Sequence, residues 1–189
     1  GGESLIEQNQ RNTLIEGLKN AQENDLIMLS DSDEIPDMSK LNLIKPSTKF
    51  TAFSQKMFMY KLNLQNLNES NWIGSKITKK KYIKSMQDLR NLKFKKYPFW
   101  RIDKYNQEII NGGWHFSFLQ SPHQILTKIK SFSHGEFNKE GINEKNIEEK
   151  ILRNEDIFER KNKLKKVTID NSYPDYIINN KEKLSNWII

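Results

Sequence analysis

The chain has 189 residues and a formal net charge of +7, from 31 Lys and Arg against 24 Asp and Glu. The absence of cysteine excludes disulfides, cysteine-ligated zinc and thiol catalysis. No apolar run approaches the roughly 20 residues that cross a bilayer, and the first residues do not have the pattern of a signal peptide. The hydrophobic share of 35% and the aromatic share of 11% indicate an ordered chain. We therefore expect a single domain over residues 1–189.

Apolar periodicity and breaker residues predict the order of the elements. The first half of the chain is predicted to form a helix over 4–20, a buried strand at Leu26–Leu29, a short helix over 36–43, a long strand over 50–62 and a basic helix over 78–92. Strands over 97–102 and 108–110 follow. The remaining elements are a helix that starts at Ser121-Pro122, a helix over 143–164 and a closing helix after Asp175. Helices that alternate with buried strands predict an α/β fold.

The positive charge is densest over residues 79–84, in the sequence KKKYIK, and aromatic residues follow it as far as Trp100. Basic and aromatic side chains interleaved in this way are typical of surfaces that bind nucleic acid. The run carries no signature of a base-reading fold, and lysines on a solvated helix face give the same pattern. A basic nucleic-acid-binding module stays open as an alternative, although we expect no nucleic acid as a partner.

Three acids in four residues, Asp31, Asp33 and Glu34, follow the predicted strand at Leu26–Leu29. In an open α/β sheet, ligands bind beyond the carboxyl ends of the strands. Carboxylates gathered at one place need a positive charge, and a hard divalent cation with oxygen ligands is the usual one. The cluster therefore predicts a divalent-cation site.

Other kinds of site also contain acidic clusters of this sort. An EF-hand loop is excluded, because the glycine and the glutamate that it needs at its sixth and twelfth positions are missing. A capping turn explains one or two of the acids but not all of them. An aspartyl-phosphate phosphohydrolase of the haloacid-dehalogenase-like type would use Asp31 as nucleophile and Asp33 as acid/base, with Asp170 and Asp175 as metal ligands. A nucleotide-sugar glycosyltransferase would use the Asp-x-Asp pair to bind a cation that also holds the donor diphosphate.

Several motifs, in the same order, resemble glycosyltransferase family 17, which includes the β-1,4-mannosyl-glycoprotein β-1,4-N-acetylglucosaminyltransferase. They are QRN at 10–12, DLIMLSDSDEIP at 25–36, GGWHFSF at 112–118, KSFSHGEF at 130–137 and YPDY at 173–176. The resemblance implies a GT-A-like fold, with a mixed sheet flanked by helices. It also implies a divalent metal, Mn²⁺ with Mg²⁺ as the alternative, and inverting transfer of N-acetylglucosamine from UDP-GlcNAc to a glycan hydroxyl.

Two departures from the family pattern shape further expectations. Similar proteins usually carry an additional N-terminal stretch with the first strand of the nucleotide-binding half, so we expect that part to be missing or minimal here. Eukaryotic members have a membrane anchor and cysteines, which this sequence lacks. We therefore expect a bacterial or viral glycan as acceptor, and a protein that is cytoplasmic or peripheral to a membrane.

The resemblance also implies roles for single residues. The expected donor contacts are Arg11, Asn12, Asp31 and Trp114, and the expected metal ligands are Asp33 and Asp31 with His115 or His134. Inverting transfer needs a base that accepts the proton of the acceptor hydroxyl, and the candidates are Glu136 and Glu34. Glu136 lies in a glycine-containing loop, whereas Glu34 would otherwise support the metal site. Surface or core roles stay open for Arg11, Trp114 and His115.

Overall fold

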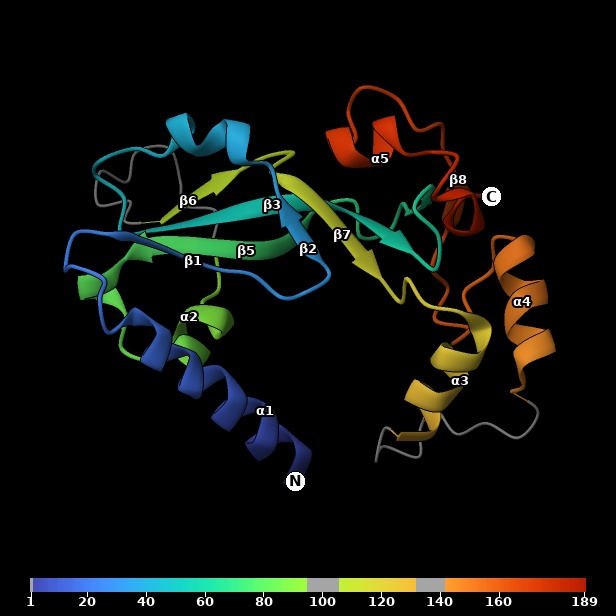
Figure 1. Cartoon of the computed structure of the whole chain (residues 1–189), viewed down its shortest axis with the longest axis horizontal. Coiled ribbons are helices and arrows are strands. Elements are labelled where there is room, and N and C mark those ends of the chain that lie inside the picture. The colour runs from blue at the N-terminus through green and yellow to red at the C-terminus, as the bar shows by residue number, and fades with distance from the viewer. Residues whose placement is uncertain (1, 95–105, 132–141) are drawn as a thin grey trace. The chain divides into compact units, whose positions relative to one another are not determined.

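The computed structural model describes residues 2–94, 106–131 and 142–189 (Figure 1). Contacts between residues divide the chain into two compact units. The first unit consists of Gly1–Gln55 and Ile73–Gly113, and the second consists of Lys56–Trp72 and Trp114–Ile189. Within the described ranges, no helix combines the length and the apolar character needed to cross a membrane. The single domain expected over residues 1–189 stays a prediction.

The first unit is built on a mixed sheet in which β1, β5, β3 and β6 are neighbours (Figure 1). These strands are β1 (Leu26–Leu29), β5 (Trp72–Lys79), β3 (Phe50–Met59) and β6 (Asn106–Ile109). β1 runs antiparallel to β5, whereas the first residues of β3 run parallel to β6. Phe53, Ile77 and Ile109 form the buried core between them. The predictions of β1 and of a strand over 108–110 are confirmed.

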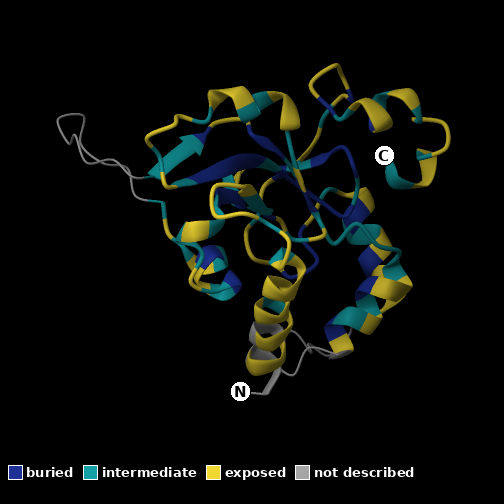
Figure 2. Cartoon of the chain, turned by 60° about the vertical axis from the view of Figure 1, so that its left-hand side comes forward, coloured by how far each residue is buried: buried dark blue, intermediate teal, exposed yellow. Residues whose placement is uncertain are grey.

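The helices of the first unit are short, apart from the first one. They are α1 (Gly2–Thr13), continued by the 3₁₀ turn η1 (Leu14–Leu18), then η2 (Met38–Leu43), η3 (Lys80–Tyr82) and α2 (Met86–Asn91). The predicted helices over 4–20 and 36–43 are therefore confirmed in outline. Figure 2 shows the described part of α1 almost wholly exposed, whereas β3 and β5 are largely buried.

The single basic helix predicted over 78–92 is wrong. β5 continues to Lys79, with Lys76 opposite Leu29 and Thr78 opposite Ile27 of β1. α2 begins only at Met86, where the hydroxyl of Ser85 accepts a hydrogen bond from the backbone N–H of Asp88. Sheet pairing and this N-cap outweigh the helical spacing of the lysines.

The second unit has a sheet of its own, formed by the last residues of β3 with β4 (Leu64–Asn66), β7 (Gly113–Ser117) and β8 (Leu164–Lys166). β3 runs parallel to β7 and antiparallel to β4, and β4 runs antiparallel to β8. The helices are α3 (Pro122–Ser131), α4 (Glu144–Leu152), α5 (Asp175–Asn179) and the 3₁₀ turn η5 (Ser185–Trp187). Mixed sheets with helices confirm the α/β class.

Two elements of the second unit end earlier than predicted. β3 ends at Met59 because Tyr60 has a positive φ of 66°. α4 ends at Leu152, and positive φ angles at Asn154, Glu159 and Lys161 show that a structured loop replaces the rest of the predicted helix over 143–164. The strand predicted over 97–102 lies outside the described residues.

Candidate functional site

The acidic cluster forms a closed turn between β1 and β2 (Glu34–Pro36) in the first unit. The backbone N–H of Glu34 donates to the carbonyl of Asp31 at 3.0 Å, and the hydroxyl of Ser30 donates to the carbonyl of Glu34 at 3.1 Å. The carboxylate of Glu34 folds back and accepts the N–H of Asp31 at 3.2 Å. As a result the Glu34 side chain is 1% exposed and that of Asp31 is 31% exposed. Asp33 is half-buried in the same turn.

Arg90, on α2, neutralises this turn. Its Nε and Nη2 donate to Oδ2 of Asp31 at 3.0 and 2.7 Å, and Nη2 lies 3.7 Å from Oε1 of Glu34. One guanidinium therefore contacts two carboxylates, Asp31 through short, charge-assisted hydrogen bonds and Glu34 through a longer ion pair. The sequence prediction assigned this neutralising role to a cation, and Arg90 performs part of it.

Ser75 and Gly74 of β5 and Gln55 of β3 lie next to the turn. The Ser75 hydroxyl is 2.7 Å from that of Ser30, accepts from the amide of Gln55 at 3.0 Å and donates to Glu34 at 3.4 Å. Gly74 leaves room for them, because a Cβ there would lie 2.1 Å from Oε1 of Gln55. The buried carboxylate of Glu34 thus has hydrogen-bond partners, as a buried charge requires.

Lys76 adds a second buried cation near the turn. It is 3% exposed, and its Nζ donates a hydrogen bond to the backbone carbonyl of Arg90. The pKa of Lys76 is lowered to about 8, mainly by burial and also by the charge of Arg90, while Glu34 and Asp31 act in the opposite direction. Protonated Lys76 and Arg90 thus bring two positive charges to Asp31 and Glu34.

Arg11 and Asn12 reach the turn through α2. Nη1 of Arg11 donates to Oε1 of Gln87 at 3.2 Å, and Oδ1 of Asn12 accepts the backbone N–H of Gln87 at 3.4 Å. Gln87 lies one helical turn before Arg90 in the same short helix. The Arg-Asn pair therefore holds the helix that carries Arg90, and the structure brings both residues into the same unit as Asp31, Asp33 and Glu34.

The remaining predicted residues lie elsewhere in the chain. In the second unit, the indole N–H of Trp114 donates to the carbonyl of Ser172 at 3.1 Å, and the buried ring of His115 makes an edge contact with Trp72 at 4.8 Å between centroids. Both side chains thus help to build that unit's interior. His134 and Glu136 lie outside the described residues.

The carboxylates of the turn could coordinate a metal ion only if a bound ligand supplied further coordinating atoms. Over the described part of the chain, no group of three or more His, Asp or Glu side chains is arranged to hold a metal ion. Asp31 accepts two hydrogen bonds from Arg90, both at its Oδ2 atom. Magnesium sites with one or two carboxylates complete their coordination with water and substrate phosphates. Asp31 and Asp33 could hold a cation only in a site of that kind, and the metal role expected of them stays a prediction.

Arg90, Lys76, Ser75, Gln55 and Gly74 were missed by the sequence analysis. The available signal was the pattern Ser85-x-x-Asp88, which marks a helix N-terminus and would have separated α2 from the lysine run. Nothing local in the sequence indicates that Arg90 contacts Asp31, because the two residues are 59 positions apart.

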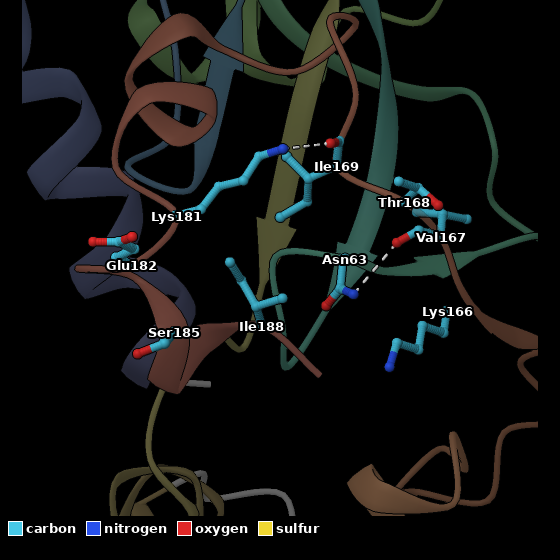
Figure 3. A pocket seen from close by; sticks show the side chains of 9 residues that line it. All are labelled: Asn63, Lys166, Val167, Thr168, Ile169, Lys181, Glu182, Ser185 and Ile188. Carbon is cyan, nitrogen blue, oxygen red and sulfur yellow. Dashed lines mark hydrogen bonds between the residues drawn. The ribbon is translucent and has the colours of Figure 1, made fainter.

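The second unit also contains an open cavity of about 800 Å³ beside β8 (Figure 3). Two of its polar side chains hold the chain together. Asn63 donates to the carbonyls of Val167 and Ile189 at 3.3 and 2.9 Å, and Lys181 donates to the carbonyl of Ile169 at 2.8 Å. The polar side chains of Lys166, Thr168, Glu182 and Ser185 line the cavity as well.

Comparison with known families gives one match. A family model described as glycosyltransferase family 17 matches residues 3–164, a range that contains the acidic turn and the whole of α2. Comparisons with curated proteins and with solved structures gave no match.

Proposed function

From the chain's membership of glycosyltransferase family 17, we propose that it transfers N-acetylglucosamine from UDP-GlcNAc to a glycan hydroxyl with inversion, in a GT-A-like fold. Family membership itself implies glycosyl transfer between a sugar donor and an acceptor. The observation that carries the finer proposal is the acidic turn, where Asp31 and Asp33 stand at the end of β1 with Arg90 beside them.

In this proposal the residues of the turn have distinct tasks. Asp33, with Asp31 beside it, would hold Mn²⁺, or Mg²⁺ in its place. A divalent cation bound there would stabilise the negative charge that develops on the departing diphosphate. Arg90 fixes the Asp31 carboxylate through two hydrogen bonds, so that the turn keeps its shape without a ligand. Arg11 and Asn12 contact Gln87, which supports a positioning role beside the donor contacts that we expect of them.

The base is proposed to be Glu136. The alternative, Glu34, has a side chain that is 1% exposed and contacts Arg90 and Ser75. A general base must reach the proton that it removes. A carboxylate that is buried and already contacts Arg90 and Ser75 is poorly placed for that. The contacts of Glu34 favour support of the turn.

Contacts within the first unit weigh against the two alternative functions. A phosphohydrolase would need the Asp31 carboxylate as nucleophile, yet both of its hydrogen bonds from Arg90 reduce its nucleophilic character. In the basic run, Lys80 donates to the carbonyl of Ala21 and Lys81 donates to Oδ1 of Asn24. These lysines thus bond within their own unit, although a nucleic-acid surface would present them to phosphates.

Calorimetric titration of UDP, with and without Mn²⁺, tests the proposal. We expect Mn²⁺-dependent binding of UDP to the chain, loss of that binding in Asp33→Ala, and no change in Glu16→Ala. Glu16 is a matched control because it is an exposed acid of the same unit whose partner is the exposed Lys19. UDP binding that Asp33→Ala leaves intact would refute the metal role of the turn.

A further inference from the structure

A smaller cavity in the second unit has the properties of a sugar-binding site. Its volume is about 300 Å³, at the lower end of the range of about 300–1,000 Å³ for small-molecule sites. Side chains from α3, α4, η5 and the preceding loops line it, among them Lys61, Gln120, Glu148, Leu152 and Trp187. A space of this size suits one sugar ring better than a nucleotide.

Four of the residues that line the cavity are apolar. They are Trp187, Pro122, Ile151 and Leu152. The backbone of Trp187 is held on both sides, since its N–H donates to the carbonyl of Leu184 at 2.8 Å and its carbonyl accepts the N–H of Leu62 at 2.8 Å. The indole of Trp187 also packs against a buried cluster of the second unit. An aromatic ring of this kind suits the apolar C–H face of a pyranose ring.

Gln120 supplies a hydrogen-bonding group that the fold does not use. Its Oε1 atom is buried and has no hydrogen-bond partner among the described residues. Buried polar atoms nearly always have a partner, so an exception calls for an explanation. The terminal amide of glutamine turns about a broad, nearly two-fold torsion. Because Oε1 gives up no hydrogen bond when the amide turns, a ligand hydroxyl in the cavity can recruit it.

The other polar groups define which ligand fits. Lys61 donates to the carbonyl of Asn186 at 2.7 Å, and the Ser121 hydroxyl is bonded to Oε1 of Gln124 at 3.2 Å, so both are engaged in the wall. Glu148 adds an exposed carboxylate at the rim. An amide oxygen and a carboxylate accept hydrogen bonds from hydroxyls and disfavour an anion. The cavity therefore suits a neutral sugar.

We propose that this cavity binds one neutral pyranose unit of the acceptor glycan. The choice of an acceptor sugar rests on the proposed transferase function, whereas the cavity itself does not involve the acidic turn. The larger cavity beside β8 is the weaker candidate, because the amide of Asn63 and the amine of Lys181 are already bonded to backbone carbonyls.

Two variants test the cavity: one removes a hydrogen-bonding group, and the other fills the opening. Gln120→Met removes the amide and keeps the length of the side chain. Leu152→Trp changes a side chain that is 62% exposed, so the fold is kept while the rim is filled. Gln22→Met is the matched control, because Gln22 is exposed and lies in the first unit. The melting temperature of each variant shows whether it is folded.

The probes are the methyl glycosides of N-acetylglucosamine, mannose and galactose, followed by saturation-transfer difference NMR. We expect at least one glycoside to bind the chain and Gln22→Met equally, and to bind Gln120→Met and Leu152→Trp at least tenfold more weakly. Absence of binding to the unaltered chain, or equal binding to all four proteins, would overturn the proposal. Asp33→Ala separates the two proposals, since it should abolish UDP binding and leave glycoside binding unchanged.

Discussion

Asp156 organises the loop after α4, and its removal is the most informative test of the second unit. Its carboxylate is 2% exposed and accepts hydrogen bonds from the Tyr60 hydroxyl at 2.6 Å, Nε of Arg160 at 3.0 Å and the amide of Asn162 at 2.9 Å. The backbone N–H groups of Phe158 and Arg160 donate to it as well, both at 3.2 Å. One side chain thus holds a loop that contains three residues with positive φ.

The expected cost of Asp156→Ala follows from these contacts. Removal of one partner of a buried ion pair costs about 3–5 kcal/mol, because the other partner is left uncompensated. Arg160 is 42% exposed and can be solvated, whereas Tyr60 is 1% exposed and would keep an unpaired hydroxyl. We therefore expect a loss near the lower end, about 3 kcal/mol, in the free energy of unfolding. For a chain of this size that corresponds to a fall of about 6–12 °C in the melting temperature.

The effect of Asp156→Ala should depend on pH. Burial alone raises the pKa of Asp156, but hydrogen bonds from Arg160, Tyr60 and Phe158 outweigh burial and hold that pKa below its usual value. A carboxyl with a lowered pKa in the folded state stabilises the fold above its unfolded pKa of about 3.9, and this contribution is lost as the pH falls further. The difference in stability between the chain and Asp156→Ala should therefore be full at pH 7 and shrink at pH 3.

Urea unfolding followed by circular dichroism at both pH values measures this difference. Glu155→Ala is the matched control, because Glu155 is the exposed neighbour of Asp156, and surface substitutions usually change stability by less than about 0.5 kcal/mol. Equal stability of Asp156→Ala and Glu155→Ala at pH 7 would refute the role assigned to the carboxylate. A difference that does not change with pH would refute the part played by its charge.

Three further predictions concern the first unit. Gly113→Ala should lower the free energy of unfolding by about 2 kcal/mol or more. The reason is that Gly113 has a φ of 145° and that a Cβ there would lie 2.2 Å from the carbonyl oxygen of Ile35. Unchanged urea unfolding would contradict this prediction. Ser85→Ala removes the cap that accepts the N–H of Asp88 at 3.0 Å and should cost about 1 kcal/mol in the same assay. Lys76 has a pKa of about 8 in the fold against 10.5 ordinarily, so the unfolded chain binds more protons between these values and stability should rise with pH there. Lys76→Met should abolish that rise, and a persistent slope in a pH series of melting curves would show that Lys76 does not cause it.

Local patterns predicted the elements whose residues decide their own structure. The apolar run of β1 and the Ser121-Pro122 start of α3 are examples, since each signal lies within the element. β5 was missed because its partners β1 and β3 lie far away in the sequence and because it carries a lysine that is buried in the fold, Lys76. Strand propensity reflects such contacts more than the strand's own residues. α4 was predicted too long because the contacts of Asp156, which shape the loop after it, reach as far as Tyr60.

The candidate site was predicted in part for the same reason. Asp31, Asp33 and Glu34 are adjacent in the sequence, so their clustering was visible directly. Their neutralisation by Arg90 depends on α2, a helix that the lysine run concealed. The placement of Arg11 and Asn12 against Gln87 also depends on α2. The wrong prediction for residues 78–92 therefore accounts for most of the contacts of the site that the sequence did not predict.

The presence of Arg90 changes what a cation has to do at the acidic turn. Arg90 contacts both Asp31 and Glu34, so it relieves part of the repulsion among the acids that a cation would otherwise relieve. A diphosphate brings further negative charge and further oxygen ligands to the same place. The cation would then find most of its ligands on the donor and only one or two on the protein, as Mg²⁺ commonly does. Cation and diphosphate should therefore bind together, each poorly without the other, which is why the titration of UDP has to be run with and without Mn²⁺.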